Sequence, residues 1–243
     1  MSLCEDSGTA RGKISSGLDP ACTPEDIEKR SFAIIDSEVT DKYFSGDAWE
    51  VARRLIHTSG DISLLDSLYL PDDAIRSGVN ALKKGAPVFT DTEMARSGIP
   101  LRRLQPLGSS VSCILSQKGL AEHAAGKNCT RSRAAMEFLG SRLAGAVVAI
   151  GNAPTALLAL LEYMASGGIP PALVIGMPVG FVNAAESKEL LLQNSSIPSL
   201  SIRGRRGGSP LAAATVNALA IIAEREITQS NRAKKDCRQI TIS

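Results

Sequence analysis

Aromatic residues are scarce in this chain, at 4% of 243 residues, and histidine occurs only twice. Alanine, valine, isoleucine and leucine must therefore fill the core, for which the hydrophobic content of 44% is ample. Such residues favour sheets that are covered by helices on both faces. The length is typical of one domain with additional residues at its ends.

A large excess of one charge is also missing, because 27 basic residues face 25 acidic ones and the net charge is +2. This balance argues against a general nucleic-acid binder. The five cysteines are scattered and form no CxxC pair, which disfavours a disulfide framework or a zinc site and favours the reducing cytoplasm. Since neither metal-ligand spacing nor a redox-cofactor motif is visible, we expect no metal and no cofactor.

No secretory signal is visible, because the first residues are polar and include no apolar segment. One uncharged run, from Leu143 to Leu161, is long enough for a membrane span, but Gly151, Asn152 and Pro154 interrupt it. The residues before this interruption are β-prone and those after it are helix-prone. We therefore expect a strand, a turn and a buried helix, and no membrane partner.

A buried strand, a turn and a helix follow one another three times in the second half of the chain. The strands are predicted at 145–150, 172–176 and 199–202. Successive units of this kind set their loops side by side at one edge of a parallel sheet, where open α/β sheets bind ligands. The sequence thus predicts an α/β fold, a single three-layer domain with a mostly parallel sheet covered by helices on both faces.

The first half of the chain is predicted to contain further elements of this domain. A capping threonine followed by proline begins the first helix, and a glycine C-cap ends the second. Apolar spacing and glycine stops indicate the others. The expected helices are 24–38, 47–59, 71–84 and 128–143, and the expected strands are 87–91 and 111–115.

Composition also suggests where the domain begins and ends. Residues 1–22 are rich in glycine, serine and charge, and we interpret them as a flexible N-terminal tail. The α/β domain is predicted at 23–223. Residues 224–243 are polar and basic, so we expect a fraying helix or a disordered C-terminal tail there.

Of the two histidines, His57 has neighbours that could support chemistry. It lies at the C-terminal end of a predicted helix, where the macrodipole stabilises a cation, and Arg53 and Arg54 lie on the same helix face. The arginine charges oppose protonation until a bound anion neutralises them. His57 could therefore donate a proton when a polyanion is bound. From spacing alone, a helix-capping role is more common. His123 has no such neighbours.

Four stretches could bind an anion. The turn at 151–155 precedes a helix whose free N–H groups would face a carboxylate or phosphate, and the loop at 203–209 offers guanidinium groups beside glycines. The loop at 176–180 lies between them in the chain, and residues 128–131 begin another helix. Each loop alone is more often a structural turn, but three aligned loops favour a ligand site.

Short segments spread over residues 25–222 carry a family resemblance. They are Arg30–Ile35, Arg54–His57, Gly85–Val88 with Asp91 and Met94, Thr130–Ser132, Val148–Leu157, Gly176–Val182, Ala184–Lys188, Arg203–Arg205 and Gly207–Ser209. In this order they resemble precorrin-8X methylmutase, also called cobalt-precorrin-8 methylmutase, of cobalamin biosynthesis. The resemblance does not extend to residues 1–22 or to those after Ala223.

The resemblance implies a cofactor-free isomerase that moves a methyl group from carbon 11 to carbon 12 of ring C in a corrin precursor. This 1,5-sigmatropic shift gives hydrogenobyrinate or its cobalt form. By the same resemblance, His57 is the proton donor and acceptor, Ser31 and Arg54 contact the substrate, and the enzyme is a homodimer with sites near the subunit interface. Because the substrate is a polycarboxylate, we also predict contacts from Thr130, Arg131, Asn152, Arg203, Arg205 and Ser209.

Two other classes of protein stay open. A non-catalytic corrinoid carrier would use the same surface to hold the product and pass it on. A phosphate-binding α/β enzyme would use the turn at 151–155, although the sequence lacks a P-loop lysine and a ribose-binding acid at the expected spacing. The sequence leaves open whether the substrate carries cobalt.

Overall fold

The computed structural model describes residues 23–40, 43–194 and 196–240, and the predicted tail at 1–22 lies outside the described residues. The α-helices are Pro24–Glu38 (α1), Gly46–Ser59 (α2), Asp72–Lys83 (α3), Glu93–Ser97 (α4), Leu101–Leu104 (α5), Leu120–Ala124 (α6), Arg131–Leu139 (α7), Pro154–Ala165 (α8), Ala184–Gln193 (α9) and Ser209–Ile240 (α10). The 3₁₀-helices are Ile62–Ser67 (η1), Gln105–Leu107 (η2), Ile114–Ser116 (η3) and Gly140–Leu143 (η4). The strands are Leu68–Tyr69 (β1), Val88–Thr90 (β2), Val111–Cys113 (β3), Val147–Ile150 (β4), Leu173–Gly176 (β5) and Ser199–Ile202 (β6).

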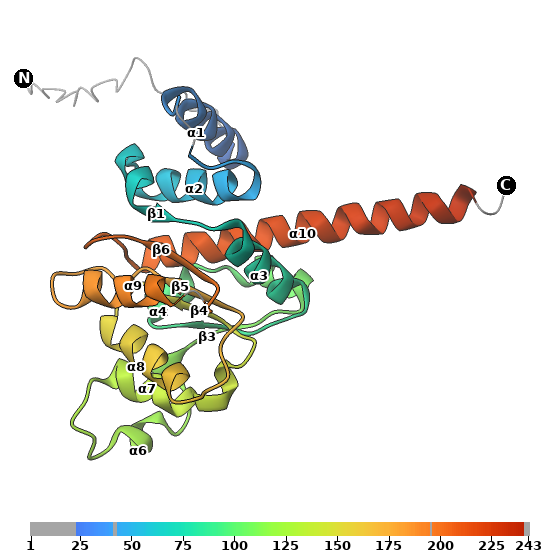
Figure 1. Ribbon diagram of the computed structural model, residues 1–243. Coiled ribbons are helices and arrows are strands. Elements are labelled where there is room, and N and C mark those ends of the chain that lie inside the picture. The colour runs from blue at the N-terminus through green and yellow to red at the C-terminus, as the bar shows by residue number, and fades with distance from the viewer. Residues whose placement is uncertain (1–22, 41–42, 195, 241–243) are drawn as a thin grey trace, which may run out of the picture.

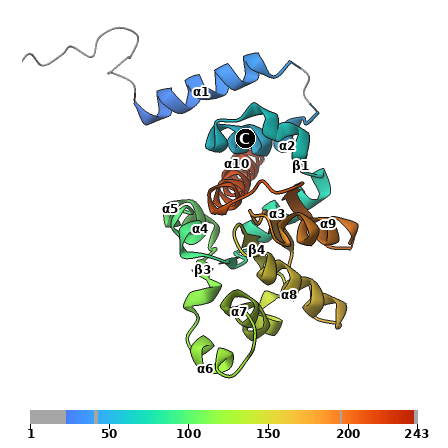
Figure 2. The ribbon, with the colours of Figure 1, turned by 90° about the vertical axis from the view of Figure 1, so that its left-hand side faces the viewer.

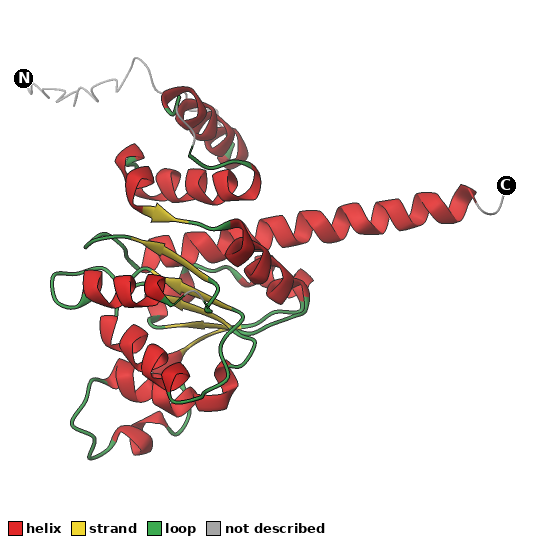
Figure 3. Ribbon diagram, in the orientation of Figure 1, coloured by secondary structure: helices red, strands yellow, loops and turns green. Residues whose placement is uncertain are grey.

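The strands form one sheet in the order β1-β6-β5-β4-β2-β3 (Figure 3). All neighbouring pairs are parallel except β1, which runs antiparallel to β6. The prediction of a mostly parallel sheet is thus confirmed. Because β4, β5 and β6 are neighbours, the loops that follow them meet at one edge, on the left of Figure 1.

Helices cover both faces of this sheet, as the three-layer prediction requires. Val147 and Ala149 of β4 belong to a core shared with α2, α3 and α10, whereas Val148 and Ile150 belong to a core shared with α7 and α8. Successive strand residues point to opposite faces, and here both faces are apolar and buried. This explains why the strands are continuous hydrophobic runs.

The local signals at the helix ends confirm the expected α1 and α2. The Thr23 side chain accepts a hydrogen bond from the backbone N–H of Asp26, which caps α1. Gly60 follows α2 in the left-handed conformation, with φ of 65°, and its N–H binds the carbonyl of Ile56. This cap fixes where α2 ends and leaves His57 in its last turn.

Helix α10 continues well past the expected domain end at Ala223. Ile227 packs against the core. Two residues earlier, Arg225 forms ion pairs with Asp47 (2.8 Å) and Glu50 (2.6 Å) of α2. These contacts stabilise the helix beyond Ala223, and its last turns extend away from the sheet (Figure 1).

Three smaller features differ from the expectations. The strand expected at 111–115 ends at Cys113 because the next residues form η3. The helix expected to reach residue 143 stops at Leu139, and Gly140, with φ of 49°, begins the 3₁₀-helix η4. The two-residue strand β1 was not predicted, since so short a strand has no periodicity to detect.

None of the helices in the described part of the chain is both long enough and apolar enough to span a membrane. The uncharged run from Leu143 to Leu161 consists of the end of η4, strand β4, a turn and most of α8. The expectation of a strand, a turn and a buried helix is confirmed.

Candidate active site

His57 lies in a pocket between the C-terminal end of α2 and helix α1. The pocket has a volume of about 280 Å³ and is lined by Ser31, Ile34, Ile35, Glu38, Ile56, His57, Gly60 and Ile62. The structure therefore brings two predicted site residues, His57 and Ser31, to one cavity. Ligand pockets usually measure about 300–1,000 Å³, so this cavity accommodates only one edge of a large ligand.

The ring of Phe32 connects the groups around His57. It meets the imidazole edge-on, with ring centroids 5.4 Å apart and an interplanar angle of 76°. The guanidinium groups of Arg53 and Arg54 lie 4.4 and 4.9 Å from the same ring centroid. Phe32 thus fixes the imidazole and both arginines relative to one another. Sequence reasoning did not assign Phe32 a role, although it lies within a segment that carried the resemblance.

Arg54 forms an ion pair with Glu28 on α1. The hydrogen bond from Arg54 lowers the pKa of the Glu28 carboxyl, and the charges of Arg103 and His57 act in the same direction. Burial, together with the nearby charge of Arg54, lowers the pKa of Arg103. A cationic cluster of Arg53, Arg54 and Arg103 therefore lies beside the His57 pocket, with two carboxylates already bound to it: Glu28 pairs with Arg54, and Asp36 pairs with Arg53 (2.7 Å).

The turn after β4 is held by a buried carboxylate. Asp91, at the end of β2, is 1% exposed and accepts hydrogen bonds from the backbone N–H groups of Gly151 (3.0 Å), Asn152 (2.7 Å) and Ala153 (2.7 Å). Burial raises the pKa of the Asp91 carboxyl, while the three N–H donors oppose the rise. Asp91 therefore occupies the N–H groups of the turn itself, and these are not available to a ligand anion.

The same finding removes the phosphate-binding interpretation of this turn. Asn152 itself remains exposed at the edge, while Gly151 and Ala153 on either side are buried. Asp91 thus determines the shape of the turn that presents Asn152.

Gly151 packs directly against the start of α10, and a Cβ atom there would approach the Cα of Ser209 within 2.6 Å. We expect Gly151→Ala to lower the free energy of unfolding by about 1–3 kcal/mol, because the contact is with backbone and cannot be relieved by a rotamer change. Urea denaturation followed through the fluorescence of Trp49, the single tryptophan, measures the loss. Asn152→Ala, at an exposed neighbouring position, should change the value by less than about 0.5 kcal/mol.

The loop between β6 and α10 presents three exposed arginines at the same edge. Arg203 pairs with Glu189 of α9 (2.9 Å), and Arg206 pairs with Asp61 (3.2 Å), which follows α2. Arg205 lies over the ring of Phe181 at 5.2 Å, and in the described residues no carboxylate pairs with it. The Arg206–Asp61 pair joins this loop to the segment that follows His57.

Apolar side chains are exposed beside these arginines. Phe181 (82% exposed), Val182 (76%) and Val179 (43%) belong to the loop between β5 and α9, and Met94 (68%) lies in the first turn of α4. Figure 2 looks onto this side of the molecule, where the loops and the end of α2 face the viewer. The edge combines apolar surface with cationic groups, a combination suited to a flat hydrophobic ligand that carries carboxylates.

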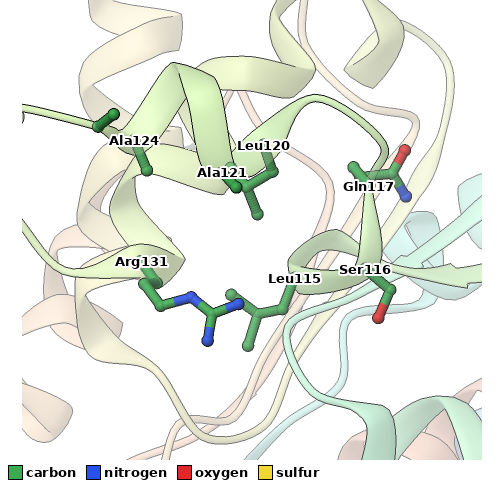
Figure 4. Close-up of a pocket in the computed structure, with 8 residues that line it drawn as sticks. Leu115, Ser116, Gln117, Leu120, Ala121, Ala124 and Arg131 are labelled. Atoms are coloured by element: carbon green, nitrogen blue, oxygen red, sulfur yellow. The ribbon is translucent and has the colours of Figure 1, made fainter.

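Thr130 and Arg131 lie farther along this side, at the start of α7. Thr130 caps α7 and donates a hydrogen bond to Thr155 of α8 (2.9 Å), so it lies beside the helix that follows the Asn152 turn. Arg131 lines a separate pocket of about 480 Å³ between η3, α6 and α7, where its guanidinium lies near Leu115 (Figure 4). These two residues therefore do not share the His57 pocket.

Ser209 is only 5% exposed, and its hydroxyl lies 2.8 Å from that of Thr92. It holds the start of α10 against the segment that follows β2. A ligand would reach the Ser209 hydroxyl only after Thr92 moved.

Comparison with known proteins gives consistent matches. The family model of precorrin-8X methylmutase matches residues 26–222. A precorrin-8X methylmutase from Sinorhizobium is 45% identical over 195 residues, which is 80% of this chain and 92% of that protein. A cobalt-precorrin-8 methylmutase from Leptospira interrogans is 40% identical over 206 residues, 82% of this chain and 94% of that protein.

A solved structure of the precorrin-8X methyl mutase of Thermus thermophilus has a similar fold. Its TM-score is 0.76 at 36% identity, and the match covers 82% of this chain and 98% of that one. With the family match, this fold defines the chain as an isomerase, a methylmutase of cobalamin biosynthesis. The chain belongs to the precorrin-8X methylmutase family, as the resemblance in its sequence indicated.

Proposed function

We propose that this methylmutase moves a methyl group from carbon 11 to carbon 12 of ring C in precorrin-8X or cobalt-precorrin-8, with His57 as the proton donor and acceptor. The product would be hydrogenobyrinate or its cobalt form. The observation that carries the proposal is the partly exposed imidazole of His57 in an apolar pocket, beside the Arg54 cluster and on the same side as the arginine loop. The scattered cysteines favour action in the cytoplasm.

The chemistry follows from the surroundings of His57. Protonation of the ring system withdraws electron density from ring C, which favours methyl migration. His57 lies in the last turn of α2, and Arg53 and Arg54 stack on the same Phe32 ring, so a substrate carboxylate bound there would place the macrocycle close to the imidazole. Proton transfer then contributes about 10²–10⁴-fold, and the remainder comes from holding the macrocycle in a reactive shape.

The substrate is proposed to extend from the His57 pocket along the exposed edge. Ser31 and Arg54 would contact it at the pocket. Along the edge, contacts are proposed from Thr130, Arg131, Asn152, Arg203, Arg205 and, if Thr92 moves, Ser209. Since a pocket of about 280 Å³ holds only part of a tetrapyrrole, we propose that the enzyme is a homodimer with its sites near the subunit interface.

Incubation of the purified protein with precorrin-8X, and separately with its cobalt form, tests this function. The visible spectrum should change over many turnovers at low enzyme concentration, and the preferred substrate reveals whether cobalt is present. One equivalent of tightly bound product without turnover would instead identify a corrinoid carrier.

Arg54 is expected to bind a substrate carboxylate in place of Glu28. Arg54→Ala should raise the dissociation constant about tenfold at low salt and by less at high salt, because salt screens the attraction. Glu28→Gln should lower it a few-fold, since the competing carboxylate is gone. Titrations followed by the visible spectrum measure both, and an unchanged constant for Arg54→Ala would remove Arg54 from the site.

A further inference from the structure

A lysine is completely buried beneath the arginine loop. Lys188, on α9, has no exposed surface, and its Nζ donates a hydrogen bond to the backbone carbonyl of Arg206 (2.6 Å). Burial lowers its pKa to about 8, and the charge of Glu189 opposes the fall. Burying an ammonium is costly unless it is paired or hydrogen-bonded. The contact with the loop is therefore the reason to expect a lysine here rather than an apolar residue of similar volume.

The loop needs contacts of this kind because its own composition does not favour one shape. Gly204, Gly207 and Gly208 all have positive φ, at 72°, 158° and 132°, and glycine gives a chain many alternative conformations. A loop of this composition adopts one conformation only where its backbone is held from outside.

The segment between β5 and α9, with Lys188 of α9 itself, supplies that support. Gly180 donates its N–H to the carbonyl of Arg205 (3.2 Å), and the Lys188 ammonium holds the next carbonyl, that of Arg206. Gly208 donates to the carbonyl of Met177 (2.9 Å). With two successive carbonyls turned inward, the side chains of Arg205 and Arg206 remain exposed at the edge.

We propose that Lys188 is a positioning residue, which holds the Arg203–Gly208 loop from beneath so that Arg205 and Arg206 meet the carboxylates of the substrate. The inference rests on the proposed function. Lys188 does not touch the substrate, because it is buried. Its ammonium also adds positive charge below the loop, which favours anions at the edge.

Limited trypsin digestion in the absence of substrate tests whether Lys188 holds the loop, because trypsin cleaves after the three arginines only when the loop opens. The variant Lys188→Met fills a similar volume without a hydrogen-bond donor. In this variant, the ratio of cleavage in the loop to cleavage after exposed Lys118 should rise at least tenfold, which corresponds to a decrease of about 1.4 kcal/mol in the free energy of loop opening. Leu191→Ala is the control, since it weakens the packing of the same helix without a loop contact, and its ratio should stay unchanged. A ratio within twofold of the original in Lys188→Met overturns the proposal.

Steady-state kinetics test whether the loop held by Lys188 binds the substrate. The loop binds carboxylates that do not react, so Lys188→Met should raise KM at least fivefold with kcat nearly unchanged. A loosened loop with unchanged KM would overturn the positioning role. Absence of turnover by the unmodified chain would overturn the proposed function instead, whereas the cleavage ratio does not depend on activity.

Discussion

Replacing His57 by alanine is expected to lower kcat about 10²–10⁴-fold and to leave the dissociation constant of the substrate nearly unchanged. The imidazole acts on the proton, whereas the arginines and the apolar edge hold the macrocycle. In the described residues, no hydrogen bond or ion pair joins the ring to another side chain, and its contact is the edge-on packing with Phe32. Its removal therefore leaves no buried polar group unsatisfied. Single-turnover kinetics and a spectroscopic binding titration measure the two constants separately.

His123→Ala is the matched control. His123 also packs against a phenylalanine, with its ring centroid 5.2 Å from that of Phe138, and its Nε2 lies 2.9 Å from the Lys127 ammonium. It lies on α6, outside the His57 pocket, so its loss should leave kcat within a factor of two. Equal losses of rate and binding in His57→Ala would mean that His57 serves the structure of the pocket rather than the reaction.

The fold was largely predictable because its signals are local. The strands β4, β5 and β6 are largely apolar runs, each followed by a turn with glycine and then a helix. This pattern is typical of buried parallel strands. The caps of α1 and α2 are also local, since Thr23 and Gly60 act within one helical turn. Local patterns of this kind therefore placed His57 at a helix end before any tertiary contact was known.

The contacts of the site were less predictable because they join distant residues. Glu28 binds Arg54 across 26 positions, and the Lys188 ammonium reaches a loop 18 positions away. Phe32 meets His57 and two arginines only because α1 packs on α2. Spacing along one helix suggested which groups share a face, but it gave no information on what covers that face.

The turn after β4 illustrates this difference most clearly. The free N–H groups of the helix after this turn were expected to face a ligand anion, whereas the N–H groups of the turn itself, at 151–153, bind the carboxylate of Asp91, 60 residues before Gly151. The contact depends on strand order, because β2 lies directly beside β4 in the sheet while β3 occupies the outer side of β2. Strand order was not evident from the sequence, so the carboxylate could not be assigned.

Asp91→Ala is consequently expected to lower the free energy of unfolding by about 3–5 kcal/mol. The substitution leaves the N–H groups of Gly151, Asn152 and Ala153 without their acceptor, two of them in buried residues, and each buried unsatisfied group costs about 1–3 kcal/mol. Water entering the space left by the carboxyl group offsets part of this sum. Urea denaturation followed by Trp49 fluorescence measures the loss.

Asp91→Asn removes one acceptor oxygen while the size of the side chain stays nearly the same. Oδ2 accepts from Asn152 and Ala153, whereas Oδ1 accepts from Gly151. An amide can place its oxygen toward the first two groups but then turns its NH₂ toward the third, so we expect a smaller loss of about 2 kcal/mol. Asp66→Ala, at an exposed aspartate, should change the value by less than about 0.5 kcal/mol. If Asp91→Ala were as mild as Asp66→Ala, the three N–H groups would have found other acceptors, and the turn presenting Asn152 would not depend on Asp91.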